Sequence, residues 1–248
     1  CNTAGSVERE AAYARMLMSR KVDAMIFISC EATDLRGKHD HYARLGEQGA
    51  KLVFVNGAAP TIDAASVSVD ERAAGELATR HLIELGHKRI GFVAGPAHAR
   101  PTTEKAQGRQ IALAAAGLHP GSSFVAHGEW GATGGRAALR KLLSRGADRP
   151  TAVICSSDAM AIGALGEARH AGLRVPDDLS IIGFDGIEAT EWTDPPLTTL
   201  AQPVPQIAQA AVDAAHALVT EPARELPHYV FRPQLLARGT AAPPGNPQ

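Results

Sequence analysis

Polar and aromatic side chains stand at or shortly after the ends of short apolar runs along this 248-residue sequence. Trp130 has an indole ring that can lie flat against the C–H face of a sugar or against a planar base. Asp185 has a carboxylate that can accept hydrogen bonds from two hydroxyl groups, which is the usual way in which a carboxylate fixes a sugar. The chemistry that these types favour is recognition of a small polar metabolite. The candidates are Asn56, Lys105, Trp130, Ser157 and Asp185.

Several of these candidates also have a purely structural interpretation. Trp130 can cap the edge of the core, and Asp185 forms with Gly186 a pair that is common in turns. Ser157 and Asp158 stand directly before a helical stripe, so one of them is its N-cap. We expect the cap to be Asp158, which leaves the role of Ser157 open.

Motifs that carry catalysis are absent from the sequence. It has no G-x-S-x-G elbow, no H-E-x-x-H zinc pattern and no G-x-x-x-x-G-K-[ST] phosphate loop. The glycines at 128, 131 and 134 lack the dinucleotide fingerprint. His39 and His41 flank Asp40, but neighbouring side chains project in different directions, and we interpret this stretch as a solvated loop. We therefore predict no catalytic residue, no cofactor and no metal.

The elements that must position these candidates follow an alternating pattern. Six short apolar runs recur at close to the ~30 residues of one βαβ unit. They are continuous rather than alternating in polarity, which is typical of parallel strands buried on both faces. In such sheets ligands bind beyond the carboxyl ends of the strands, where the candidates stand. The runs are Ala24–Ile28, Leu52–Val55, Ile90–Ala94, Ser123–Ala126, Ala152–Cys155 and Leu179–Phe184.

Helical spacing of apolar residues fills the stretches between the runs. Asp70 is a plausible N-cap of a helix that Gly86 ends, and a stripe from Met160 ends at Gly172. A third helix is predicted over Pro203–Val219. Two short strands come after it, Tyr229–Phe231 and Leu235–Ala237. The sequence thus predicts a doubly wound α/β fold.

The composition excludes two classes of partner for this segment by itself. The net charge is −1 and no stretch concentrates Lys and Arg, so the segment lacks the electrostatic footprint of a DNA-binding surface. No apolar run approaches the ~20 residues of a membrane span. Hydrophobic residues make up 45% of the chain, which suits a globular core.

Four stretches in order carry a resemblance to a known family. They resemble the effector-binding domain of the lactose-repressor (LacI/GalR) family of bacterial transcription regulators. The resemblance runs from Cys1 to about Thr240. The stretches are Val69–Pro96, Pro150–Ala164, Gly172–Asp185 and Asp194–Leu200.

The resemblance implies two periplasmic-binding-protein-like lobes, each a doubly wound and mainly parallel sheet, joined by three crossovers with the effector between them. Residues 1–69 and 202–220 are expected in an incomplete first lobe, and residues 70–201 and 221–240 in the second. Residues 241–248 are rich in Pro and Gly and are expected to be disordered.

The family's ligand-binding positions fall on Asn56, Lys105, Trp130, Ser157 and Asp185. Two of them depart from the family pattern. Lys105 stands where members have Arg, three residues before the glycine matched by Gly108, and Ser157 stands where Asn is common. Lys cannot make the bidentate fork of Arg, so a sugar acid or a sugar phosphate is a possible effector beside a neutral sugar.

The resemblance also implies a cytoplasmic homodimer that binds operator DNA through a helix-turn-helix headpiece. That headpiece and the first strands of the first lobe are expected upstream of Cys1, so we expect these residues alone to expose apolar surface and to fold poorly. The alternative function is a periplasmic sugar-binding protein of a transporter. A third class, an α/β enzyme that uses Asp158 or Asp185, has no visible pairing of nucleophile and base to support it.

Overall fold

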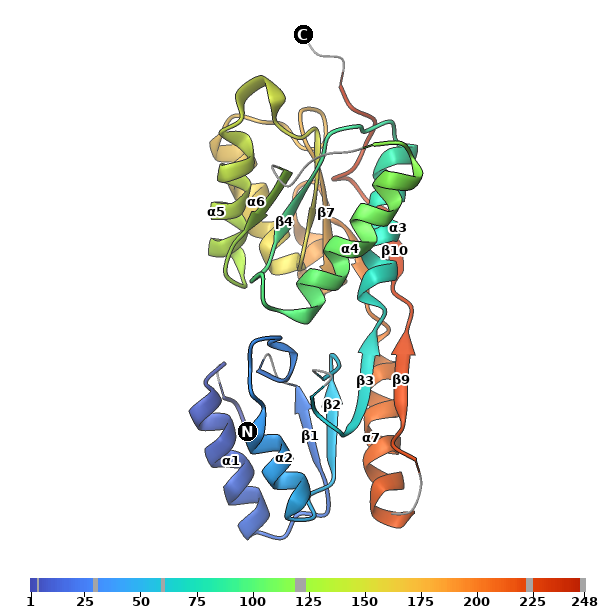
Figure 1. The fold of residues 1–248 in the computed structure, drawn as a ribbon. Helices are drawn as coiled ribbons and strands as arrows, with labels where there is room; N and C mark the ends of the chain where they lie inside the picture. Colours follow the sequence, from blue (N-terminus) through green and yellow to red (C-terminus); the bar gives the residue numbers. More distant parts are fainter. Residues whose placement is uncertain (4, 29–30, 59–60, 119–123, 222–224, 246–248) are drawn as a thin grey trace. The chain divides into compact units, whose positions relative to one another are not determined.

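A computed structural model describes residues 1–248 except 4, 29–30, 59–60, 119–123, 222–224 and 246–248. The chain forms two compact units, which are described separately (Figure 1). Unit 1 comprises Cys1–Val69, His98–Arg100 and Pro203–Phe231, and unit 2 comprises Asp70–Ala97, Pro101–Gln202 and Arg232–Gln248. Both units are α/β, as the sequence predicts.

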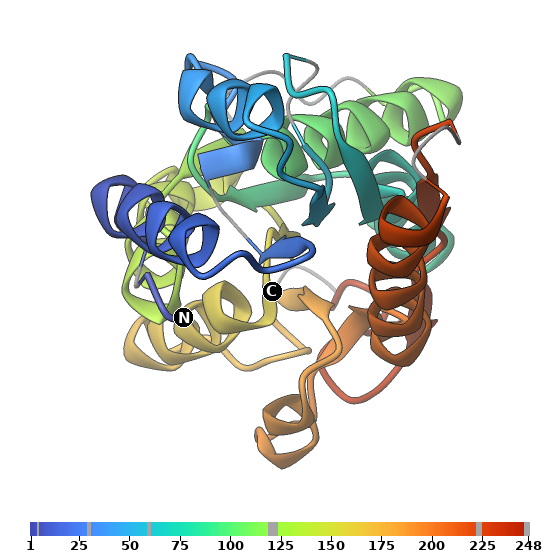
Figure 2. The same cartoon turned by 90° about the horizontal axis from the view of Figure 1, so that it is seen from below.

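Unit 1 has a four-stranded parallel sheet in the order β1-β2-β3-β9. Its strands are β1 (Met25–Ile28), β2 (Leu52–Val55), β3 (Ala65–Val69) and β9 (His228–Phe231). Its helices are α1 (Val7–Ser19), α2 (Asp40–Glu47) and α7 (Val204–Thr220), with a short 3-10 helix η1 (Glu31–Thr33). Figure 2 shows the three long helices arranged around the strands.

Successive side chains of each strand in unit 1 point to opposite faces of the sheet, and helices pack on both faces. Phe27 and Phe54 are paired in register and their rings stack with centroids 5.1 Å apart. They pack with Tyr42 of α2, while Ala14 brings α1 into the same core. Helix α7 packs on β2 and β3. The helices therefore bury all of β2, while alternate residues of β3, Ser66 and Ser68, remain partly exposed.

Unit 2 has a six-stranded sheet in the order β10-β8-β7-β6-β4-β5, parallel except for the β10–β8 pair. The strands are β4 (Ile90–Ala94), β5 (Val125–His127), β6 (Ala152–Cys155), β7 (Ser180–Asp185), β8 (Thr198–Ala201) and β10 (Gln234–Leu236). The helices are α3 (Glu71–Glu84), α4 (Arg100–Ala115), α5 (Ala132–Leu143) and α6 (Asp158–His170), with 3-10 helices η3 (Gly146–Asp148) and η4 (Glu188–Trp192).

The core of unit 2 depends on glycines at the crossing of two helices. A Cβ atom on Gly135 of α5 would lie 2.1 Å from the backbone oxygen of Met160, and one on Gly163 of α6 would lie 1.9 Å from that of Ala132. Real side chains cannot approach so closely, so glycine is required at both positions. The close contact lets α5 and α6 cover one face of the sheet together.

Two expectations about the C-terminal region are wrong. Residues 221–240 were expected entirely in the second lobe. Strand β9 instead pairs with β3 in unit 1, and only the residues from Arg232 onward belong to unit 2. Parallel pairing of Val67 with Tyr229 supplies the backbone hydrogen bonds that hold β9 there.

Residues 241–245 are also ordered, not part of a disordered tail. The Ala242 carbonyl accepts hydrogen bonds from His87 Nε2 at 2.8 Å and from the Ser180 hydroxyl at 3.0 Å. Thr240 donates to the Ile181 carbonyl and accepts from the Thr198 backbone N–H. These buried polar partners outweigh the Pro/Gly-rich composition. Residues 246–248 lie outside the described part of the chain.

Candidate functional site

The carboxyl ends of the parallel strands in unit 2 place four of the five candidates along one edge of the sheet. Asp185 is the last residue of β7, Ser157 follows β6 by two residues, and Trp130 follows β5 by three. Lys105 lies in α4, the helix that follows β4. Since β5, β4, β6 and β7 are consecutive neighbours in the sheet, this edge is the expected position of a ligand site.

Asp185 has a backbone conformation that non-glycine residues rarely adopt. Its φ is 133°, which costs conformational energy and is found mostly where the surroundings impose it. Its Oδ1 accepts a hydrogen bond of 2.8 Å from Gln202 Nε2. Burial raises the pKa of Asp185 to about 6, although the Lys105 ammonium and the Gln202 amide both lower it. Gln202 thus orients the carboxyl, whose pKa of about 6 lies well above the usual aspartate value.

Asp158 has a different role from the N-cap role that the sequence predicts. Its carboxylate is buried and accepts hydrogen bonds from the backbone N–H groups of Gly186 at 2.7 Å and Ile187 at 2.9 Å. The Thr199 hydroxyl donates to its other oxygen at 2.6 Å. Burial raises the pKa of Asp158, and these donors oppose the rise. Asp158 therefore fixes the turn that directly follows Asp185.

Ser157, not Asp158, is the N-cap of α6. Its hydroxyl accepts a hydrogen bond of 3.2 Å from the Met160 backbone N–H. The expectation failed because both types are good caps, and only the tertiary partners of Asp158 decide between them. As a cap, Ser157 lies at the sheet edge with its hydroxyl already engaged.

Lys105 is buried and contacts protein groups, in contrast to the expected ligand-facing cation. Only 3% of the residue is exposed. Its ammonium forms an ion pair with Glu71 in the first turn of α3 and lies 3.7 Å from the centroid of the Phe184 ring. Burial raises the pKa of the Glu71 carboxyl, while Lys105 opposes the rise.

Glu71 was missed by sequence reasoning. A glutamate in the first turn of a helix also complements the helix dipole, so its position carries no separate signal. The pairing depends on the contact between α3 and α4. There the two helices meet without room for side chains, because a Cβ atom on Gly108 would lie 1.9 Å from the Arg72 backbone oxygen.

Trp130 is partly exposed, at 39%, and packs over Gly95. A Cβ atom on Gly95 would lie 2.7 Å from two atoms of the indole ring, so only glycine fits beneath the ring. The Gly95 backbone is itself fixed, since its N–H donates to the Ser156 hydroxyl at 2.9 Å and its carbonyl lies 2.8 Å from His127 Nδ1. The indole is thus positioned on a rigid strand end with part of its surface accessible.

Asn56 belongs to unit 1 and is not placed with the other four candidates. It is exposed and directly follows β2 with a left-handed φ of 72°, and Gly57 continues the turn at 82°. Asn tolerates this conformation better than most residues. Its place at a strand end agrees with the sequence prediction, while its role as a ligand-binding residue remains a prediction.

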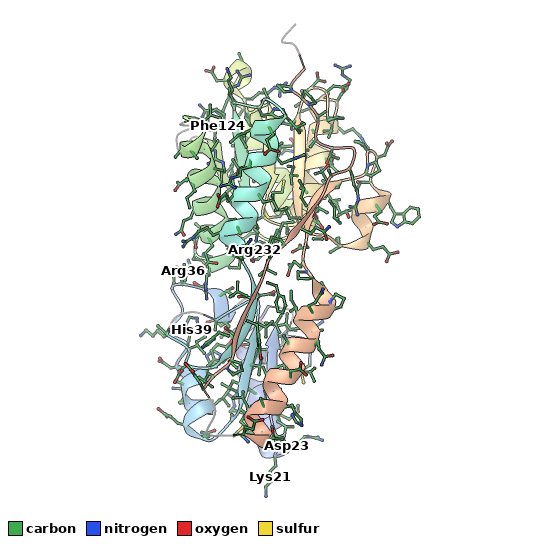
Figure 3. The ribbon with its side chains drawn as sticks, turned by 90° about the vertical axis from the view of Figure 1, so that its right-hand side faces the viewer. Lys21, Asp23, Arg36, His39, Phe124 and Arg232 are labelled. Carbon is green, nitrogen blue, oxygen red and sulfur yellow. The ribbon has the colours of Figure 1, made fainter. Side chains whose placement is uncertain are left out.

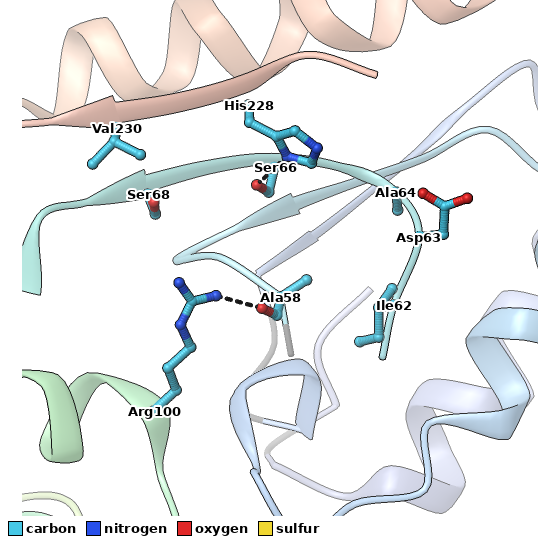
Figure 4. Close-up of a pocket in the computed structure, with 9 residues that line it drawn as sticks. All are labelled: Ala58, Ile62, Asp63, Ala64, Ser66, Ser68, Arg100, His228 and Val230. Carbon is cyan, nitrogen blue, oxygen red and sulfur yellow. Dashed lines mark hydrogen bonds between the residues drawn. The ribbon is translucent and has the colours of Figure 1, made fainter. Parts of the chain in front are cut away.

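Unit 1 also contains a polar cavity that the sequence did not predict (Figure 4). Its volume is about 590 Å³. Ser66 and His228 are paired across β3 and β9, and the hydroxyl lies 2.9 Å from the imidazole Nδ1. Arg100 donates to the Ala58 carbonyl at 2.5 Å beside it.

The His39–His41 stretch is structural, although it is not the solvated loop that the sequence suggests. His39, labelled in Figure 3, is 4% exposed and precedes α2. Its Nδ1 lies 2.9 Å from the Thr61 hydroxyl and its Nε2 lies 3.0 Å from the Glu31 carbonyl. No group of three or more potential metal ligands occurs among the described residues.

Comparison with known proteins identifies related chains. The family model of the periplasmic binding protein-like domain matches residues 79–241. An uncharacterized HTH-type transcriptional regulator of Streptomyces limosus is 40% identical over 229 residues, which cover 91% of this chain and 64% of the relative. The HTH-type regulator MalR of Streptomyces coelicolor is 39% identical over 98% of this chain and 70% of its own length. The chain thus spans about two thirds of the length of these relatives.

Solved structures give the same grouping. A complex of the transcriptional regulator CelR with cellobiose superposes with a TM-score of 0.86 and 29% identity, covering 95% of this chain and 71% of that one. A LacI family regulator from Mycobacterium smegmatis has a TM-score of 0.85 and 35% identity, and the match covers 96% of this chain and 86% of that one.

Proposed function

Because the chain belongs to the LacI family of transcriptional regulators, we propose that it is the effector-sensing part of a repressor. In this proposal a sugar or a related polar metabolite binds at the carboxyl edge of the unit 2 sheet. Binding then changes the affinity of the whole protein for its operator DNA.

The observation that carries the proposal is the pairing of an accessible indole with an oriented carboxyl on one sheet edge. Trp130 offers a flat apolar surface for the C–H face of a sugar ring. Asp185, held by Gln202, offers acceptors for hydroxyl groups. Asn56 is proposed to add a contact from unit 1, and Ser157 a polar group beside Asp185.

The regulation itself is proposed to be allosteric. A ligand that binds one arrangement of the two units better than another shifts the population toward it, and operator affinity follows by linkage. Operator binding is assigned to a helix-turn-helix headpiece outside this chain, as the description of the relatives as HTH-type supports. The chain's own net charge of −1 is consistent with that division of labour.

Binding without turnover is the reaction class we propose. Family members are transcriptional regulators. The buried carboxyl of Asp158 is fully engaged with backbone and Thr199 donors. Incubating a bound sugar with the protein and following it by NMR tests this, and any protein-dependent product argues for an enzyme instead.

A cytoplasmic homodimer is the proposed assembly. Trp192 at the end of η4 is 80% exposed, and an indole of that exposure is typical of an interface position. Within the described residues, no helix is both long and apolar enough to cross a membrane. Sedimentation of the full-length protein and of Trp192→Ala tests the assembly, and equal dimer affinity in both contradicts a role for Trp192.

The experiment that tests the function uses the full-length protein. Sugars and nucleosides are screened by thermal shift, since a ligand at 100 times its Kd stabilises by about 2.7 kcal/mol. A ligand that binds is then titrated into a complex with operator DNA followed by fluorescence anisotropy. A ligand that binds without changing operator affinity contradicts allosteric regulation. The periplasmic alternative predicts the same ligand binding with no operator binding at all.

A further inference from the structure

The ion pair with Glu71 engages the Lys105 ammonium, which α4 brings next to Phe184 and Asp185 at the end of β7. The Lys105 side chain is 4% exposed and that of Glu71 is 11% exposed. An ion pair so shielded from water is screened far less than a surface pair, so its partners stay together. The Phe184 ring, at 3.7 Å, covers the ammonium from another direction.

Several carboxyl groups interact with this pair and with its neighbours. Asp185 interacts with the Lys105 ammonium and also with the Asp158 carboxyl. The negative charges of Asp70, the N-cap of α3, and of Glu104 in α4 repel the charge of Glu71. Arg238 is the cation that acts on Asp158, and it is itself paired with Glu191 at 2.9 Å. Asp185, Asp158, Asp70 and Glu104 therefore add negative charge around the Lys105–Glu71 pair.

A negatively charged ligand meets an unfavourable field in this arrangement. A bound phosphate or carboxylate near Asp185 needs a cation or several N–H donors to replace its hydration. The Lys105 charge is already compensated by Glu71. A hydroxyl group, in contrast, can donate directly to Asp185.

We propose that Glu71, by holding the ammonium of Lys105 against the Phe184 ring, makes the effector site select against anionic ligands. Glu71 is thereby a specificity-determining residue that acts through Lys105. This inference rests on the proposed function of the same site. It also reverses the suggestion, drawn from Lys105 in place of Arg, that a sugar acid or a sugar phosphate is bound.

The test measures binding of inorganic phosphate to the full-length protein, with sodium chloride at matched ionic strength as the reference. Four proteins are compared: the natural protein, Glu71→Gln, Lys105→Met, and the double variant. The natural protein is expected to show no saturable rise of Tm with phosphate. Glu71→Gln is expected to show a saturable rise of Tm with phosphate, because an uncompensated ammonium remains. The double variant loses that rise.

A merely structural role for Glu71 gives a different result. In that case Glu71→Gln lowers Tm without any response to phosphate, and the inference is overturned. Phosphate binding by the natural protein that Lys105→Met abolishes also overturns it, because the Lys105 charge is then available to anions.

A folding defect does not leave the question open. Breaking one partner of a buried pair is strongly destabilising, whereas replacing both by uncharged groups is often neutral. If Glu71→Gln does not melt cooperatively, Glu71→Asp is used in its place. The shorter side chain keeps the negative charge but moves the carboxylate away from the Lys105 ammonium by one methylene, which weakens their pairing. A phosphate response is then expected in Glu71→Asp, and its absence contradicts the inference.

Failure of the proposed function is separable from these outcomes. If no sugar or nucleoside binds the natural protein, the proposed function fails while the phosphate comparison still reports on Glu71. If neutral sugars bind and Glu71→Gln leaves the ratio of phosphate to sugar affinity unchanged, only the specificity inference fails.

Discussion

The Asp158 carboxylate accepts a hydrogen bond of 2.7 Å from the backbone N–H of Gly186, the residue that directly follows Asp185. A group at the start of α6 thus fixes the end of β7. Gly186 has a left-handed φ of 77°, and a Cβ atom there would lie 2.6 Å from the Ala201 Cβ. The position of the candidate ligand carboxyl therefore depends on a residue that itself need not touch the ligand.

Replacing Asp158 tests this dependence. Asp158→Asn puts N–H donors where the carboxylate accepts, so we expect a loss of about 1–3 kcal/mol in the free energy of unfolding. Effector affinity is expected to fall as well, because the Asp185 turn loosens. Urea unfolding and calorimetric titration measure the two effects. Thr199→Val, which removes only one donor, is the control and should cost less on both scales.

Trp130 provides the second prediction. Trp130→Ala removes the flat surface proposed for the sugar, and we expect effector affinity to fall about tenfold or more, equivalent to about 1.4 kcal/mol. Titration calorimetry measures the loss. Trp130→Phe is the control, since it keeps a flat aromatic ring at the same position and should lose less affinity. Equal losses in Trp130→Ala and Trp130→Phe argue against stacking of the ligand on Trp130.

The raised pKa of Asp185, about 6, predicts a pH dependence of effector binding. Hydroxyl groups donate to the ionised carboxylate, so affinity should rise as pH increases from 5 to 7. Calorimetric titration across this window measures the rise. Asp185→Asn should bind weakly and without this dependence. An affinity that is flat with pH in the natural protein excludes Asp185 as the acceptor.

The same carboxyl affects the stability of the ligand-free protein with the opposite pH dependence: it stabilises the folded state at low pH, whereas it favours effector binding at higher pH. Its folded pKa lies above the value of about 3.9 expected in the unfolded chain, so the folded state binds the proton more tightly. The resulting stabilisation is complete below about pH 4 and is lost as pH rises through 6. It amounts to at most about 3 kcal/mol. Urea unfolding of the natural protein and Asp185→Asn should therefore diverge between pH 4 and 7.

Thr240 anchors the chain beyond β10. Its hydroxyl donates to the Ile181 carbonyl at 2.6 Å and accepts from the Thr198 N–H at 2.8 Å, both in the sheet of unit 2. Thr240→Val keeps the shape and removes both bonds, so we expect a loss of about 1–3 kcal/mol in urea unfolding. Thr240→Ser keeps the hydroxyl and serves as the control. Equal stability of the two variants contradicts the anchoring role.

Most of the strands could be predicted because they are continuous apolar runs buried on both faces. Strands β2, β4 and β6 have the predicted bounds, and β1 begins one residue later than predicted. Strands β5 and β7 differ from the predicted runs by one or two residues at each end. Strand β8 was missed, since its two buried threonines resemble a polar loop in the sequence. Strand β3, with the alternation ASVSV, was missed although that pattern is typical of a half-buried strand.

The candidate site was predictable in position but not in its contacts. The strand-end rule places Trp130, Ser157 and Asp185 on one edge from sequence alone. The exchange of roles between Ser157 and Asp158 could not be predicted, because both are good caps and the partners of Asp158 are distant in sequence. Likewise the burial of Lys105 depends on Glu71, 34 positions earlier in the sequence.

The pairing of β9 with β3 and the packing of α7 on β2 and β3 determine when the first sheet can be completed during synthesis. A chain emerging from the ribosome contains β1, β2 and β3 long before residues 203–231 are added. Until then one face and one edge of this first sheet have no cover. The first sheet is therefore completed only after nearly all of unit 2 has been synthesised, and a nascent chain arrested before residue 203 should be prone to aggregation.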